Sequence, residues 1–137
     1  LDIDTSGLLL LTNDGELANR LTHPSYEIPK TYIARVHGEV KPGVRRRLLD
    51  GVELEDGPIA VDSFRTMETY GDITTVEIVV HEGRNRLVRR LMDEVGYPVR
   101  ELVRTKFGPI RLEHLQPGTM RRVKGPQLAA LYDAVGL

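Results

Sequence analysis

The apolar residues of this 137-residue chain change their spacing along the sequence, and that change limits the possible folds more than any other feature. From residue 30 to 37 apolar and polar residues alternate, which is the pattern of a half-buried strand. From 86 to 95 apolar residues recur every three or four positions, as on one face of a helix, and Gly96 follows as a helix-ending residue. A chain with both patterns must pack helices against a sheet.

The remaining segments predict further elements of both kinds, separated by turn-forming residues such as Asn13-Asp14-Gly15. We expect a buried strand at residues 7–12, further strands at 59–70, 73–81 and 99–107, and helices at 14–21, 42–50 and 127–135. The chain has no internal repeat, linker or low-complexity segment. The order of elements therefore predicts one α+β domain, with helices packed against a largely antiparallel sheet.

The composition excludes several classes of protein. The chain has no cysteine, which excludes disulfides, cysteine nucleophiles and thiolate metal sites. No apolar run approaches the roughly 20 residues that a membrane span needs, and the run at residues 7–11 is far too short. We therefore expect a cytoplasmic protein without a membrane segment.

The charged residues are distributed unevenly, although the formal net charge is only −1. Residues 51–81 contain one basic and seven acidic side chains, whereas residues 82–124 contain eleven basic and five acidic ones. A near-neutral total can therefore conceal a basic face of the kind that phosphate contacts need. The same imbalance is also typical of an ordinary solvated surface.

Two segments contain residues suited to chemistry. Residues 1–7, Leu-Asp-Ile-Asp-Thr-Ser-Gly, form a carboxylate-bearing turn before a strand, where a reacting group could be held rigidly, although the same residues are ordinary turn formers. Residues 82–90, Glu-Gly-Arg-Asn-Arg-Leu-Val-Arg-Arg, lead from a glycine turn into a basic first turn of helix. Backbone N–H groups and arginines there could bind phosphate, and the alternative is a solvated arginine face.

Together with neighbouring segments, these two motifs resemble the RsuA/RluB-type RNA pseudouridine synthases. The resemblance rests on residues 1–12, 14–24, 30–36 (Lys-Thr-Tyr-Ile-Ala-Arg-Val) and 82–91, and it continues through 108–110. Four motifs in the right order are more specific than any one alone. The resemblance implies the pseudouridine synthase fold, a mixed, mainly antiparallel sheet flanked by helices with the active cleft across its middle, and it implies neither a metal nor a cofactor.

The resemblance also assigns roles to individual residues. In that family the aspartate of the Leu-Asp pair is catalytic, which implies this role for Asp2. A carboxylate suits the reaction because it can act as a nucleophile or remove a proton. The family's tyrosine beside the target base corresponds to Tyr32, which could otherwise be a core aromatic residue. Arg89 would pair with Asp2 and keep it ionised.

Ribosomal RNA is the partner that the resemblance implies, and the motifs are closer to those of the large-subunit enzymes than of the small-subunit one. The target uridine must leave its stack to reach Asp2. We expect side chains around the cleft to bind the RNA, namely Thr5, Lys30, Arg84, Asn85, Arg86, Arg90, Arg104 and Lys106.

The chain departs from the family at its start. The family normally has Gly-Arg directly before the Leu-Asp pair, preceded by the first strands of the catalytic domain and an S4-type RNA-binding domain. We therefore expect residues 1–137 to be the C-terminal portion of the catalytic domain of a longer protein. Without the preceding part, we expect weak or no turnover, and unpaired sheet edges that favour self-association.

Two other functions are compatible with parts of the sequence. Asp2 and Asp4 suggest a haloacid-dehalogenase-type phosphatase, but that motif needs an apolar strand before the aspartates and Thr or Val where Ser6 stands, so we reject it. The second alternative is a catalytically inactive RNA-binding or ribosome-assembly factor on the same fold. The joint presence of Asp2, Tyr32 and Arg89 favours an enzyme.

Overall fold

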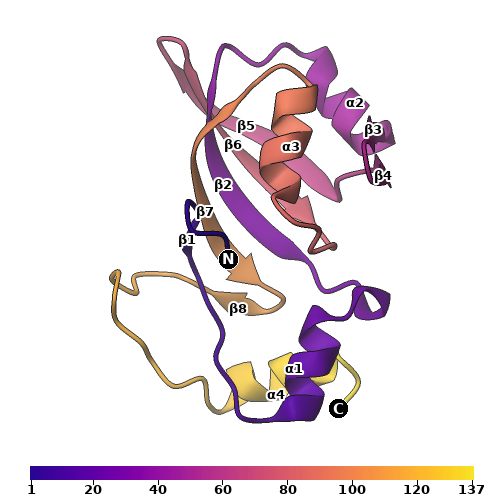
Figure 1. Cartoon of the computed structure of the whole chain (residues 1–137). Helices are drawn as coiled ribbons and strands as arrows, with labels where there is room; N and C mark the ends of the chain where they lie inside the picture. The colour runs from indigo at the N-terminus through magenta and orange to yellow at the C-terminus, as the bar shows by residue number, and fades with distance from the viewer.

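The computed structural model describes residues 1–137 as one sheet with helices packed on one face and at one end (Figure 1). A six-stranded sheet has the order β1-β7-β2-β6-β5, with β8 paired to β7, and only the β1–β7 pair is parallel. The strands of this sheet are β1 (Ser6–Gly7), β2 (Lys30–His37), β5 (Ser63–Tyr70), β6 (Ile73–Val80), β7 (Val99–Phe107) and β8 (Ile110–Arg111). A separate hairpin consists of β3 (Val52–Leu54) and β4 (Gly57–Ile59). The helices are α1 (Gly15–Thr22), the short 3₁₀ helix η1 (Pro24–Tyr26), α2 (Gly43–Asp50), α3 (Leu87–Glu94) and α4 (Pro126–Ala134).

The larger hydrophobic core lies between one face of the sheet and the layer formed by α2, α3 and the β3–β4 hairpin (Figure 1). It contains 17 buried residues. Alternate residues of β2 and β6 supply one side of it, because side chains on a strand point to opposite faces in turn. Leu91 of α3 is fully buried there, and the truncation of such a residue to Ala typically costs about 2–5 kcal/mol.

A smaller core of eight buried residues joins α1 and α4 to the far end of β7. Leu17 and Leu21 of α1 belong to this core together with Leu131 of α4 and Phe107 of β7. Asp14 caps α1 by accepting a hydrogen bond from the backbone N–H of Leu17, as an N-cap aspartate does. Figure 1 shows α1 and α4 together, below the sheet and apart from α2 and α3.

The opposite face of the sheet is open and carries cross-strand ion pairs. Arg35 of β2 pairs with Glu101 of β7 at 3.2 Å, and Arg65 of β5 pairs with Glu77 of β6 at 3.1 Å. Opposite charges on neighbouring strands stabilise a sheet modestly. None of the helices has the length and the apolar character needed to cross a membrane.

The sequence patterns predicted most of these elements. The strands expected at 30–37 and 99–107 are confirmed to the residue, and the helices begin or end within about one residue of their expected bounds. The α+β class and the mainly antiparallel sheet are also confirmed.

The strand expected at residues 7–12 was wrong in its extent. Only Ser6 and Gly7 pair with β7, and Leu9 and Leu11 are 58% and 75% exposed. Leu8 is the last residue whose backbone N–H reaches β7, where it donates to the carbonyl of Arg104. The chain then leaves the sheet to reach α1, so the apolar run does not continue as a buried strand.

The strand expected at 59–70 was also wrong in its first part. Ile59 belongs to β4 of the small hairpin, and the long strand begins only at Ser63. A two-residue turn connects β3 to β4, and it is followed by Gly57 at φ +118°, a conformation that favours glycine. The Asp56-Gly57 pair was therefore a hairpin signal within the sequence.

Candidate active site

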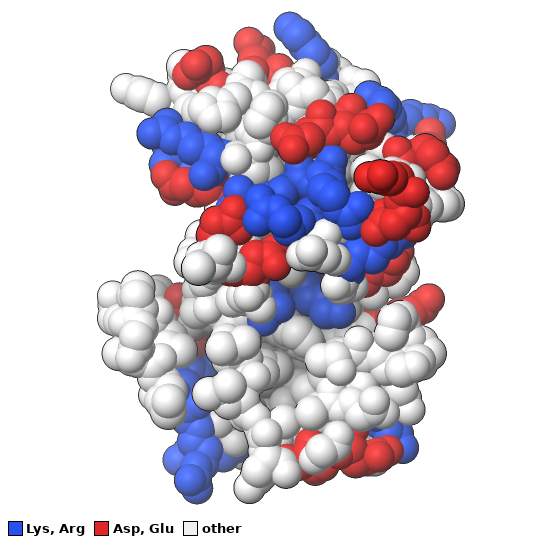
Figure 2. Space-filling view, viewed as in Figure 1, with Lys and Arg blue, Asp and Glu red and all other residues white.

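A pocket of about 330 Å³ lies where the turn at residues 1–6 meets α3 and the sheet. Its lining includes four basic side chains, those of Lys30, Arg84, Arg86 and Arg104, and two acidic ones, those of Asp2 and Glu82. In Figure 2, Lys and Arg side chains gather across the middle of the same face of the molecule, with acidic side chains around them. The pocket is therefore suited to an anionic ligand.

Asp2 enters this pocket from the turn that precedes β1. The backbone N–H of Thr5 donates to the carbonyl oxygen of Asp2 at 3.1 Å, which closes the turn. The carboxylate of Asp2 makes no hydrogen bond or ion pair within the protein, whereas the hydroxyl of Thr5 is buried without a partner. Both residues line the pocket, and the carboxylate of Asp2 is available to a ligand.

Gly7 fixes the position of this turn by allowing β1 to approach β7 closely. Its φ is +112°, and a Cβ added to it would lie 2.2 Å from the backbone oxygen of Arg104. The collision is with backbone, so no side-chain movement could relieve it. Glycine is therefore required where the chain that carries Asp2 joins the sheet.

Asp4 connects the same turn to the first turn of α3. Its carboxylate accepts a hydrogen bond from Nη1 of Arg86 at 2.9 Å and lies 3.5 Å from Nε of Arg89, and its carbonyl accepts from Nη2 of Arg89 at 2.6 Å. Burial raises the pKa of Asp4, but the Arg86 hydrogen bond and the charges of both arginines outweigh it, so the pKa lies below its ordinary value.

The expected pairing of Arg89 with Asp2 is therefore wrong in this structure, because the guanidinium of Arg89 contacts Asp4 instead. The physical reason is that Asp4 faces α3 while Asp2 faces the pocket, so the second carboxylate of the turn meets both arginines. Arg86 reaches Asp4 from a left-handed backbone conformation (φ +52°), which is uncommon outside glycine and is concentrated at functional sites.

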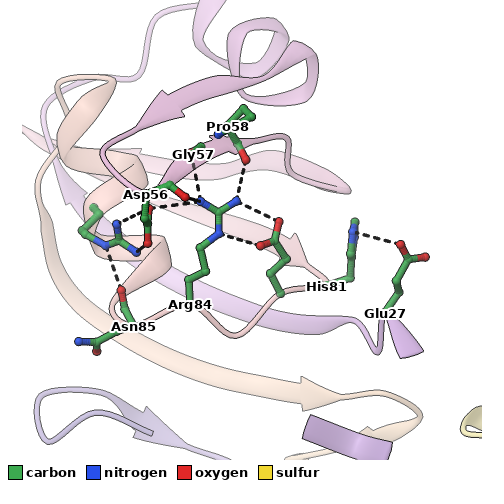
Figure 3. Close-up of polar contacts among 9 residues, drawn as sticks. Glu27, Asp56, Gly57, Pro58, His81, Arg84 and Asn85 are labelled. Carbon is green, nitrogen blue, oxygen red and sulfur yellow. Dashed lines mark hydrogen bonds and ion pairs between the residues drawn. The ribbon is translucent and has the colours of Figure 1, made fainter. Parts of the chain in front are cut away.

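Arg84 lies at the centre of a network that ties the β3–β4 hairpin to the pocket (Figure 3). It donates to Glu82 at 2.7 Å and 3.3 Å, to Asp56 at 3.3 Å, and to the carbonyls of Gly57 and Pro58 at 3.1 Å and 2.6 Å. The N–H groups of Arg84 already donate to acceptors within the protein, so this arrangement does not favour the phosphate contact that we expected for Arg84. Arg84 instead holds the hairpin against the pocket wall.

Arg90 has a similar role at the turn of the hairpin. It donates to both carboxylate oxygens of Asp56, at 2.8 Å and 3.0 Å, and to the carbonyl of Asn85 at 2.9 Å. This two-pronged pairing is the strong form of an arginine–carboxylate contact. The hydrogen bond from Arg90 is the main reason why the pKa of Asp56 falls from 3.8 to about 2. The role of Asp56 could not be predicted from the sequence, because its partners lie about 30 residues further along the chain.

We expect Asp56→Asn to lower the melting temperature at neutral pH and to have progressively less effect in acid. The folded-state pKa is depressed, so the stabilisation is complete above the unfolded pKa of 3.8 and is lost as the pH falls towards about 2. Thermal unfolding of both proteins between pH 7 and pH 2 measures this difference. A constant difference across that range would contradict the role given to the ionised carboxylate.

Lys30 and Arg104 are two buried cations that line the pocket from neighbouring strands. Each is only 8% exposed. A β-bulge in the pairing of β2 with β7 places Arg104 opposite Tyr32, on the same sheet face as Lys30. Arg104 donates to the carbonyl of Leu8 from Nε at 2.9 Å and from Nη2 at 2.7 Å. Arg104 therefore also holds the segment that follows the Asp2 turn.

The structure thus brings most of the residues singled out from the sequence together at one site. Those that line the pocket are Asp2, Thr5, Lys30, Tyr32, Arg84, Asn85, Arg86 and Arg104. Arg89 and Arg90 lie outside it, on α3, and contact Asp4 and Asp56. Lys106 is the strand partner of Thr31, between Lys30 and Tyr32, so it lies on the opposite face of the sheet. No cluster of three or more His, Asp or Glu side chains has the arrangement of a metal site.

Comparison with known proteins gives consistent results. The model of a family described as RNA pseudouridylate synthase matches residues 1–94. An uncharacterized RNA pseudouridine synthase of Mycobacterium tuberculosis is 52% identical over 137 residues, which are 100% of this chain and 54% of that protein. The ribosomal large subunit pseudouridine synthase B of Pseudomonas aeruginosa is 47% identical over 139 residues, covering 100% of this chain and 36% of the relative.

A crystal structure of a pseudouridylate synthase has a TM-score of 0.83 and 31% sequence identity to this chain. The match covers 96% of this chain and 56% of the other. The chain therefore spans about half the length of the mycobacterial relative and of this structure.

Proposed function

Because this chain belongs to the RNA pseudouridylate synthase family, we propose that it carries the site at which a uridine of ribosomal RNA is isomerised to pseudouridine, with Asp2 as the catalytic carboxylate. The observation that carries the proposal is the position of Asp2 in a basic pocket, with no partner for its carboxylate within the protein. The names of several relatives support the large ribosomal subunit as the source of the RNA. That substrate places the reaction in the cytoplasm.

The reaction changes the atom through which the base is bonded to the ribose. The bond between N1 of uracil and C1′ of ribose breaks, the base turns, and a bond forms between C5 and C1′. The proton on C5 leaves and N1 gains one, so the composition of the nucleotide is unchanged. Asp2 can serve this reaction by attacking the sugar, or by removing a proton from it as the base departs.

The pocket walls suit the other requirements of the reaction. A uridine must leave its stack to reach Asp2, at a cost of a few kcal/mol. Tyr32 lines the pocket half-buried and offers an aromatic face to the flipped base. Arg86 and Asn85 line the pocket and are exposed, so both are placed to contact the RNA.

Arg89 acts in this proposal as a positioning residue rather than through direct contact with the base. Its guanidinium, with 12% of the side chain exposed, holds both the carbonyl and the carboxylate of Asp4. Asp4 lies two residues from Asp2 in the same turn. Arg89 and Arg86 together therefore fix the direction in which Asp2 enters the pocket.

Release of tritium from ribosomal RNA that contains 5-tritiated uridine tests the proposal, because C5 loses its hydrogen when it bonds to C1′. We expect the full-length protein that contains residues 1–137 to release tritium in proportion to the pseudouridine formed. If that protein binds the RNA but releases no tritium, a catalytically inactive RNA-binding or ribosome-assembly factor becomes the better account.

A further inference from the structure

Lys30 has no function in the mechanism described above, yet it occupies an unusual environment. It is only 8% exposed and lines the same pocket as Asp2. Its ammonium group makes no hydrogen bond and no ion pair within the protein, and its contact is with the ring of Phe107, 5.4 Å from Nζ to the ring centre. Lysine is almost never buried without a partner, because the removal of an ammonium group from water is costly.

The neighbours of Lys30 increase this cost. Arg104 is buried beside it, with its guanidinium 4.8 Å from the centre of the same Phe107 ring. Burial first, and the charge of Arg104 second, lower the pKa of Lys30 from its ordinary value of 10.5. The pocket has only two carboxylates, and that of Glu82 is already paired with Arg84.

A ligand that interacts with the ammonium group of Lys30 would offset the free-energy cost of burying it beside Arg104. An ammonium needs an acceptor or a negative charge, and the pocket that it faces is the place where the proposed reaction creates one. When the N1–C1′ bond breaks, its electron pair goes to uracil. The resulting anion is spread over the ring and its two carbonyl oxygens, whether the sugar is then bonded to Asp2 or has lost a proton.

We propose that Lys30 is a further catalytic residue of this site, whose ammonium group stabilises the negative charge on uracil as the glycosidic bond breaks. This inference rests on the proposed function. The contribution is electrostatic, so Lys30 transfers no atom: the electron pair moves from the N1–C1′ bond to uracil and later forms the C5–C1′ bond. A fixed cation is effective in this role, because it needs no reorganisation when the charge appears.

The variant Lys30→Met tests this role, because Met keeps the length and the apolar stem of the side chain and removes its charge. We expect the single-turnover rate of pseudouridine formation to fall by about 10²- to 10³-fold, as when one donor of an oxyanion site is removed. We expect the Kd for RNA to change by less than about threefold. The melting temperature should stay the same or rise, since the variant no longer buries an unpaired charge. Lys41→Met, at an exposed lysine before α2, is the matched control and should leave all three quantities unchanged.

A second measurement separates charge stabilisation from the binding of phosphate. Fluorine at C5 withdraws electrons and stabilises the uracil anion, so RNA with 5-fluorouridine at the target needs less help from Lys30. We expect Lys30→Met to slow glycosidic cleavage of the fluorinated RNA several-fold less than that of normal RNA.

The other outcomes overturn the inference. An unchanged rate with weaker RNA binding and a smaller salt dependence would assign Lys30 to a phosphate contact. A lower melting temperature with proportional loss of all activity would assign it a structural role. If the full-length wild-type protein forms no pseudouridine at all, the proposed function fails and this inference fails with it, whereas equal rates for wild type and Lys30→Met refute this inference alone.

Discussion

Asp2→Asn is expected to abolish pseudouridine formation, with a loss of at least about 10⁴-fold in the single-turnover rate, as is typical when a group that reacts with the substrate is removed. Asparagine has nearly the same shape as aspartate but is neither a nucleophile nor a base of comparable strength. The carboxylate of Asp2 makes no contact that stabilises the fold, so the melting temperature should stay within about 2 °C of wild type. Single-turnover assays and thermal unfolding measure the two effects.

RNA affinity is the control for this prediction. The groups proposed to grip the RNA, such as Arg86 and Asn85, are unaffected by the change, so we expect the Kd to stay within about threefold. Asp50→Asn is a matched variant, because Asp50 is an exposed aspartate whose only ion pair is a weak one with Arg46 at 3.6 Å. It should retain full activity. Pseudouridine formation by Asp2→Asn at the wild-type rate would show that another group does the chemistry.

Gly7→Ala is expected to produce the largest structural effect of a single methyl group in this chain. The new Cβ would overlap the backbone of Arg104, with its oxygen 2.2 Å away, at a φ of +112° that only glycine adopts readily. Backbone strain of this kind costs about 1–3 kcal/mol before the overlap is counted. We therefore expect a loss of about 3 kcal/mol or more in the free energy of unfolding, or separation of β1 from β7.

Either result should also remove activity, because the segment that carries Asp2 would lose its attachment to the sheet. Urea unfolding and the single-turnover rate together measure these effects. Gly43→Ala is the control: Gly43 lies at the start of α2, and a Cβ there would meet no atom within 4 Å. We expect that variant to be slightly more stable than wild type, by about 0.5–1 kcal/mol. Equal stability of Gly7→Ala and wild type would contradict the close approach of β1 to β7.

The parts of the fold that depend on local pattern could be predicted from the sequence. The strand at residues 30–37 alternates because one face meets a core and the other meets water, so its bounds follow from its side chains. The helix that begins after Arg86 follows from apolar spacing and from Gly96 at its end in the same way. The position of a segment in the tertiary structure could not be predicted in this way. Leu9 and Leu11 have the composition of a buried strand, but the chain turns away from the sheet at Leu8, and no local pattern encodes that turn.

The sequence predicted which residues form the site, but it did not predict which arginine pairs with which carboxylate. The motifs identified Asp2, Lys30 and Tyr32, which the structure brings into one pocket from separate segments. Which arginine meets which carboxylate depends on distances between segments more than 80 residues apart, as for Arg86 and Asp4. Sequence alone cannot supply those distances, so the prediction paired Arg89 with the wrong aspartate of the turn, Asp2 in place of Asp4.

These pairings change how the basic residues are understood. Arg84 and Arg90 are occupied by the hairpin, and Arg89 is occupied by Asp4, so much of the positive charge at this site positions other groups. Arg86 pairs with Asp4 through Nη1, but its side chain is 44% exposed and can also contact RNA. Lys30 is the basic side chain of the pocket that has no such partner within the protein. This distinction separates residues that hold the site together from those available to a substrate.

Site-resolved mapping of pseudouridine in large-subunit ribosomal RNA, after incubation with the full-length protein that contains residues 1–137 and with its Asp2→Asn variant in parallel, tests the central claim most directly. The account predicts conversion of a specific uridine by the wild-type protein and no conversion by the variant, with similar RNA binding by both. Binding of the RNA without conversion of any uridine by the wild-type protein, or equal conversion by both proteins, would contradict it.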